Sequence, residues 1–109
     1  MSEESFRLHA GITELIAGMA LLKLEGGGST GLRPEHSDDR LKKKNLAKGI
    51  KATYEGDRVS LVVELNVDYG QDALKVAERA QELAREAVET MTGYAVSEVN
   101  VNVVGVNAP

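Results

Sequence analysis

The clearest pattern along the chain is an alternation of apolar and polar positions over residues 50–68. In residues 59–68, VSLVVELNVD, every second position is apolar, starting from the first: Val59, Leu61, Val63, Leu65 and Val67. Most positions between them are polar, which is typical of a strand with one buried and one wet face. Residues 50–54 alternate in the same way, and the turn signal Glu-Gly-Asp-Arg at 55–58 separates the two runs. The pattern predicts a β-hairpin of two amphipathic strands.

A helical spacing of apolar residues, at intervals of three and four, runs through residues 11–24. It predicts a mostly buried helix. Gly18 lies in its middle, where glycine costs roughly 1 kcal/mol relative to alanine unless another backbone packs closely against it.

A second helical pattern covers residues 73–91, with small apolar residues on one side and charged residues on the other. The small side predicts close packing on a sheet. Arg85 and Glu89, four residues apart on the charged side, are expected to attract each other. Asp72 is the expected N-cap of this helix, and Gly93 is expected just past its end.

The last apolar run, residues 96–106, alternates valine with asparagine. One face of this predicted strand carries Val99, Val101 and Val103, and the other carries Asn100 and Asn102. Asparagine has poor β-propensity, so a solvated or partner-facing surface explains these two residues better than a covered one. A weaker alternation at residues 5–9, SFRLH, predicts a short first strand.

The expected order of elements, β-α-β-β-α-β, predicts an α+β fold. It is a two-layer sandwich with two helices on one face of a small, mainly antiparallel sheet. A right-handed crossover through the second helix is expected to place the last strand beside the first hairpin strand, antiparallel to it. The other face of the sheet would then be open to water or to another subunit. Its candidate interaction residues are Glu64, Asn66, Asn100 and Asn102.

Residues 25–40, EGGGSTGLRPEHSDDR, predict a flexible loop, because glycine, polar and charged residues leave only one residue to bury. Its glycines do not form a phosphate-binding loop, since no Lys-Ser or Lys-Thr pair follows them. His36, Asp38 and Asp39 could bind a metal, but a metal site needs three or four rigidly held ligands. We therefore expect neither a metal nor another cofactor.

With 109 residues, a net charge of −4 and no cysteine, the chain is expected to form one domain over residues 1–109. The lack of cysteine excludes disulfides and thiolate chemistry. No apolar run is long enough to cross a membrane, and no secretory signal begins the sequence. No acid–base pair or nucleophile motif is present. These features predict a cytoplasmic protein that is not an enzyme and does not insert directly into a membrane.

A basic cluster stands out in this acidic chain. Its members are Arg40, Lys42, Lys43, Lys44, Lys48 and Lys51. It could be a solvated patch, or it could bind an acidic protein partner, nucleic acid or anionic lipid. Nucleic acid is the less favoured partner, because aromatic residues for base stacking make up only 4% of the chain.

Several segments together resemble the alkaline shock protein family, the envelope stress response proteins of Gram-positive and related bacteria. The most specific are the Tyr69-Gly70 break, the helix end Val-Glu-x-Met-Thr-Gly at 88–93, and the finish Val-Asn-Val-x-Val-x-Gly-Val at 99–106. The segments IAGMALLKLEG at 16–26 and KKNLAKGIKA at 43–52 also fit. The chain departs from the family in its short stretch before the first helix and in its glycine-rich segment at 26–39.

The resemblance implies a non-enzymatic protein linked to cell-envelope stress, which forms homo-oligomers and, in some members, is held near the membrane by a small membrane-anchor protein. The sequence thus predicts a scaffold or adaptor that acts through its surface, peripheral to the membrane through a partner. The alternative is a nucleic-acid-binding or metabolic regulator that uses the basic cluster at 40–51.

Overall fold

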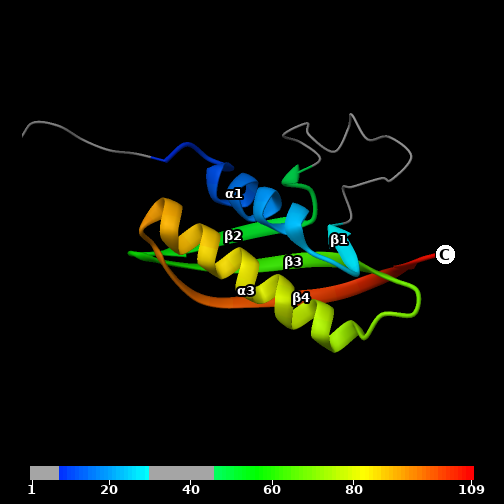
Figure 1. Cartoon of the computed structure of the whole chain (residues 1–109). Coiled ribbons are helices and arrows are strands. Elements are labelled where there is room, and N and C mark those ends of the chain that lie inside the picture. The colour runs from blue at the N-terminus through cyan, green and yellow to red at the C-terminus, as the bar shows by residue number, and fades with distance from the viewer. Residues whose placement is uncertain (1–7, 30–45) are drawn as a thin grey trace, which may run out of the picture.

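A computed structural model describes residues 8–29 and 46–109 of the chain, in which helices cover one face of a sheet (Figure 1). The elements are α1 (Ile12–Ala20), the short 3-10 turn η1 (Leu21–Lys23), β1 (Gly27–Ser29), β2 (Ile50–Glu55), β3 (Arg58–Asp68), α3 (Ala73–Thr92) and β4 (Ala95–Asn107). The predicted α+β class, with helices packed on a mainly antiparallel sheet, is confirmed.

Strand β3 is the centre of the sheet. It pairs with β2 antiparallel, from Ile50 opposite Val63 to Glu55 opposite Arg58, as the predicted hairpin requires. Further along, β1 also pairs with it antiparallel, and β4 pairs with it parallel over its whole length. Because β4 occupies one complete edge of β3, β1 and β2 share the other edge end to end.

The predicted place of the last strand is wrong. It was expected beside the first hairpin strand, β2, whereas β4 lies beside β3. Its direction is as expected, since a strand parallel to β3 is antiparallel to β2. Helix α3, whose 20 residues span about 30 Å, carries the chain back to the start of β3, and a strand reached through such a crossover runs parallel to β3. The free edge of β3 offers 11 residues for pairing, whereas β2 has only 6, so β3 is the better neighbour for the long strand β4.

Most of the predicted first strand, residues 5–7, lies outside the described part, and Leu8 and His9 are not in a strand. The prediction of a loop at 25–40 is wrong at residues 27–29, which form the short strand β1. Gly27 makes this pairing possible, because a Cβ there would lie 2.5 Å from the carbonyl oxygen of Asn66. Residues 30–40 lie outside the described part.

The ends of α3 are as predicted. The Asp72 carboxylate accepts hydrogen bonds from the backbone N–H groups of Leu74 (3.0 Å) and Lys75 (3.3 Å). Gly93 follows the helix with φ of 79° in the left-handed region, and its N–H donates to the carbonyl of Glu89. These two residues fix where the helix begins and where the chain turns into β4.

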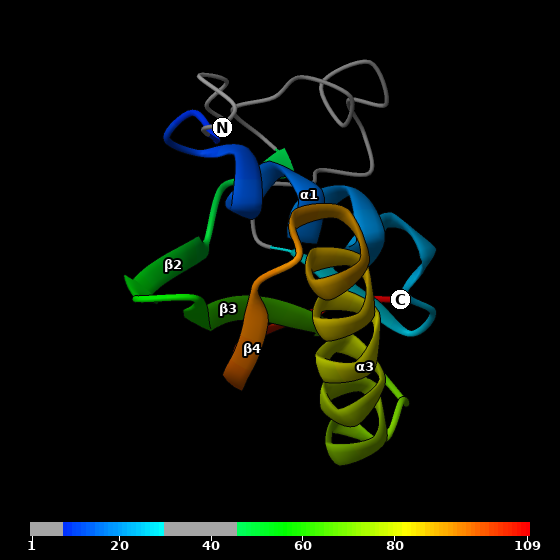
Figure 2. The same cartoon turned by 90° about the vertical axis from the view of Figure 1, so that its left-hand side faces the viewer.

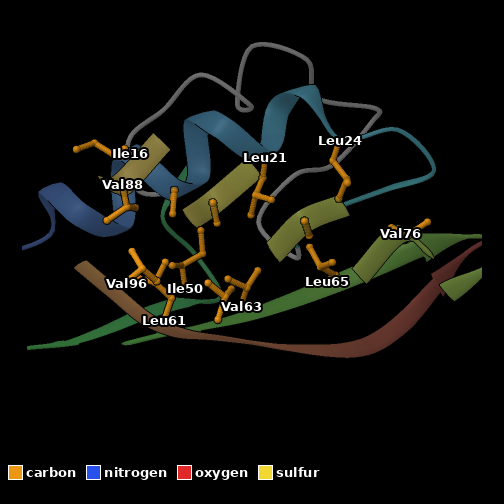
Figure 3. Close-up of a cluster of buried hydrophobic side chains, with 14 of the residues drawn as sticks. Ile16, Leu21, Leu24, Ile50, Leu61, Val63, Leu65, Val76, Val88 and Val96 are labelled. Carbon is orange, nitrogen blue, oxygen red and sulfur yellow. The ribbon is translucent and has the colours of Figure 1, made fainter. Parts of the chain in front are cut away.

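The core lies between the helices and the sheet (Figure 3). All five apolar positions of the alternating pattern in β3 point into it and are at most 3% exposed. Ala80 and Ala84 of α3 are completely buried, and their small side chains let the helix lie close to the strands. Each buried Val or Leu contributes roughly 1.5–3 kcal/mol relative to an exposed one.

Helix α1 is held by two contacts with the chain that leads into β2 and with β2 itself. A Cβ on Gly18 would lie 1.9 Å from the carbonyl oxygen of Leu46, so another backbone does pack closely against this glycine. The Tyr54 hydroxyl of β2 donates a hydrogen bond to the hydroxyl of Thr13, which is fully buried in α1. The Tyr54 ring also lies 5.3 Å from the ring of Tyr94, centroid to centroid.

Candidate interaction surface

The side of the sheet away from the helices forms a polar surface, called here the outer face. Helices α1 and α3 both lie on the opposite side (Figures 1 and 2). The alternation of side chains along a strand places Ser60, Val62, Glu64, Asn66 and Asp68 of β3 on the outer face. In the described part of the chain, no helix covers this face.

The structure brings the four predicted interaction residues together on the outer face. Glu64 is directly opposite Asn102 across the β3–β4 pair, and Asn100 is opposite Val62, the next outer-face position along. Asn66 is opposite Gly105. Glu64, Asn100 and Asn102 are exposed and Asn66 is half-buried. The asparagines thus occupy solvated strand positions.

The edge of β4 that faces away from β3 is partly covered by side chains of α3. Arg85 donates from Nη1 to the carbonyl of Val96 (2.6 Å), and Glu89 accepts at Oε2 from the N–H of Val96 (3.0 Å). One turn earlier, Gln81 donates from Nε2 to the carbonyl of Val99 (3.1 Å). The three residues are four apart and form one stripe on the helix. Figure 2 shows α3 beside β4, on the side opposite β2.

This capping stripe, Gln81, Arg85 and Glu89, was missed in the sequence, where Arg85 and Glu89 were assigned to the charged side of the helix and expected to attract each other. Both instead satisfy backbone groups of β4. The available signal was three long polar residues at four-residue spacing next to an alanine-rich face.

Beyond Val99, the same edge of β4 has no strand or capping side chain in residues 8–29 and 46–109. We call this part, from Asn100 to Asn107, the distal edge. Its valines are unusually exposed: Val103 is 42%, Val104 52% and Val106 63% exposed. Tyr69, which is also exposed, lies at the end of this segment and donates its N–H to the carbonyl of Asn107.

The basic cluster is only partly described. Lys48 and Lys51 are exposed, and Lys51 is opposite Val62 on the outer face. Arg40, Lys42, Lys43 and Lys44 lie outside the described residues, as do His36, Asp38 and Asp39. Among the residues that the structure describes, no group of three or more His, Cys, Asp or Glu side chains could hold a metal ion. Because four of its six members lie outside the described residues, the role of the basic cluster in binding a partner stays a prediction.

The sequence of the chain matches a known protein family over nearly its whole length. The model of the alkaline shock protein 23 family, which is described by a "cell envelope-related function", matches residues 2–108. The chain belongs to this family. The resemblance to the alkaline shock proteins in the sequence is thereby confirmed, and the function of the family is related to the cell envelope.

Two relatives of this alkaline shock family chain come from Bacillus subtilis (strain 168). Over 101 residues the chain is 30% identical to the uncharacterized protein YqhY, and the match covers 87% of this chain and 71% of YqhY. Over 66 residues it is 32% identical to the uncharacterized protein YloU, and the match covers 61% of this chain and 55% of YloU. No solved structure gives a significant match.

The helices of this alkaline shock family chain differ from membrane-spanning helices. Within the described residues, neither α1 nor α3 combines the length and the apolar character that crossing a bilayer requires. The longer helix, α3, carries charged residues along its exposed side.

Proposed function

We propose that this alkaline shock family chain is a non-enzymatic scaffold or adaptor at the cell envelope, which acts by self-association and by protein–protein contacts during envelope stress. The observation that carries this proposal is the uncovered outer face, with Glu64, Asn66, Asn100 and Asn102 side by side on two paired strands. A sheet with one face packed on helices and the other open offers a continuous surface to a partner.

The chemistry of this surface favours protein contacts over catalysis. Amide side chains both donate and accept hydrogen bonds, so the asparagines can match a polar partner surface, including a second copy of the same surface. Glu64 is acidic, while Lys51 on the neighbouring strand is basic, so the face carries both signs of charge. A mixed face of this kind supports specific pairing rather than general binding to polyanions.

The proposed partners are a second copy of the chain and a small membrane-anchor protein that holds the assembly at the cytoplasmic side of the membrane. The family's envelope-related function supports the second partner. In this arrangement the chain does not enter the bilayer itself.

The mass of the full chain in solution tests self-association. Light scattering after size exclusion should give a mass above 11.7 kDa that rises with protein concentration. The double variant Asn100→Lys with Asn102→Lys should lower that mass, because it places like charges on the proposed contact surface. The matched control, Lys75→Ala with Arg79→Ala, removes two exposed cations of α3, away from the outer face, and should leave the mass unchanged. A monomeric mass for the unaltered chain at every concentration contradicts the proposal.

The location of the protein in the cell tests the proposal that it acts at the cell envelope. A fluorescent fusion should concentrate at the cell periphery under alkaline or cell-wall stress. A uniform distribution under those conditions would rule out the anchoring partner while leaving self-association open.

A further inference from the structure

We propose that the distal edge of β4, from Asn100 to Asn107, pairs antiparallel with the same edge of a second copy of this chain. The inference rests on the proposed self-association and names its interface. It differs from a contact between two outer faces, because backbone hydrogen bonds rather than asparagine side chains would join the two molecules.

The first argument is the direction of the backbone groups in β4. The N–H and C=O of Val96 and the C=O of Val99 point away from β3, since side chains of α3 bind them. The register with β3 is regular from Val99 to Val103. Alternation along a strand therefore points the N–H and C=O groups of Val101 and Val103 away from β3 as well. Such a row of unpaired groups is a template for another strand.

The second argument is where the capping stripe ends. Gln81, Arg85 and Glu89 saturate the edge only as far as Val99. Over that first half, α3 occupies the space that an added strand would need. Over the distal edge, an added strand meets only backbone and the exposed valines 103, 104 and 106.

The third argument fixes the direction. Two identical strands related by a two-fold axis across a sheet run antiparallel. In that arrangement the distal edges face each other, and each capped half lies beyond the end of its partner's strand. A parallel arrangement in register would instead place the two capped halves, each with its helix, against one another.

The fourth argument identifies the occupant. Residues 100–107, NVNVVGVN, contain no ionisable side chain, although 28% of the whole chain is charged. Strand edges are usually protected from self-pairing by lysine or another charge, and here that protection is missing. A second copy brings only valine, asparagine and glycine into contact across the edge, with no like charges opposite each other. By contrast, strand β2 does carry charged side chains, those of Lys51 and Glu55.

Pairing of this kind would join two sheets into one, with both outer faces on the same side. The surface proposed to bind other proteins would then extend across both molecules.

Two variants of the full chain test the edge pairing. Val103→Pro removes an outward N–H, and proline is tolerated on edge strands, so the pairing with β3 is retained. Arg79→Ala, the matched control, removes an exposed cation of α3 and changes neither the outer face nor the distal edge. We expect a dimer for the unaltered chain, at least about 100-fold weaker dimerisation for Val103→Pro, because proline lacks the outward N–H at this position, and no change for Arg79→Ala. Circular dichroism checks that both variants fold.

Amide hydrogen exchange of the unaltered chain gives a second readout that needs no variant. The N–H groups of Val101 and Val103 should exchange at least about tenfold more slowly when the protein concentration is raised through the dimerisation range. The N–H of Val96, already bound to Glu89, should not respond. Dimerisation without added protection at Val101 and Val103, or dimerisation that Val103→Pro leaves intact, overturns the edge interface and leaves self-association standing. A chain that is monomeric throughout overturns both.

Discussion

Arg85 of α3 donates a hydrogen bond to the carbonyl of Val96 in β4 over 2.6 Å. The helix thereby supplies a hydrogen-bond donor to the edge of β4, which a neighbouring strand would otherwise supply. Together with Gln81 and Glu89, it protects half of an edge that would be open to unwanted pairing.

Removal of this bond is expected to destabilise the chain and to expose more of the β4 edge. We expect Arg85→Ala to lower the free energy of unfolding by about 1–2 kcal/mol, because a half-buried carbonyl loses its partner. Urea denaturation measures this effect. Arg79→Ala is the matched control: Arg79 is exposed, forms an ion pair of 3.6 Å with exposed Glu82, and should contribute less than about 0.5 kcal/mol. Equal effects of the two substitutions would contradict the capping role.

Gly18→Ala is expected to destabilise the chain, although helix propensity alone would predict that it stabilises it. Propensity alone favours alanine by roughly 1 kcal/mol in a helix interior. The added Cβ would lie 1.9 Å from the carbonyl oxygen of Leu46, which is backbone and cannot rotate away. We expect destabilisation of about 1–3 kcal/mol from this overpacking. The control Met19→Ala alters an adjacent, 53% exposed residue and should change stability by no more than about 0.5 kcal/mol. A more stable Gly18→Ala chain would show that α1 is not held against Leu46.

The hydrogen bond between Tyr54 and Thr13 should contribute a measurable coupling energy between β2 and α1. A double-mutant cycle with Tyr54→Phe and Thr13→Val isolates it. We expect each single change to cost about 1 kcal/mol and the coupling to be about 0.5–1.5 kcal/mol, the usual net contribution of such a bond. Thermal unfolding of the four proteins gives these values. Additive losses would mean that the two hydroxyls act independently.

The N-cap of α3 is expected to contribute through the Asp72 carboxylate, which accepts from Leu74 and Lys75. Asp72→Ala should lower the free energy of unfolding by about 1 kcal/mol, whereas Asp72→Asn keeps a capping oxygen and should lose only a few tenths. Urea denaturation at neutral pH compares the two. If Asn and Ala cost the same, the capping hydrogen bonds are not the source of the effect.

The sequence predicted those parts of the fold that depend on local periodicity. The hairpin of β2 and β3 follows from strict alternation, and Asp72 and Gly93 mark the ends of α3 through well-known capping chemistry. The four outer-face residues were also predicted, because side-chain direction in a strand depends only on position.

The remaining parts depend on contacts between distant segments. The pairing of β4 with β3 does not follow from the Val-Asn alternation, because the same alternation would result if β4 paired with β2. Strand β1, Gly-Gly-Ser, has no side-chain pattern, since its pairing relies on the absence of a side chain at Gly27. The capping stripe was missed because a polar residue on a helix is solvated in most cases, and only the position of β4 shows otherwise.

The parallel pairing of β3 and β4 has a consequence for how the chain folds while it is synthesised on the ribosome. The β2–β3 hairpin is local and can form as soon as it emerges. The second edge of β3 pairs only later, because the partner of Ser60 on that edge is Glu98. Until β4 has been synthesised and α3 has folded back, one edge of β3, which supplies five residues of the core, stays open. Strand β4, which is made after β1, β2 and β3, is therefore the one that covers the open edge of β3 in the nascent chain.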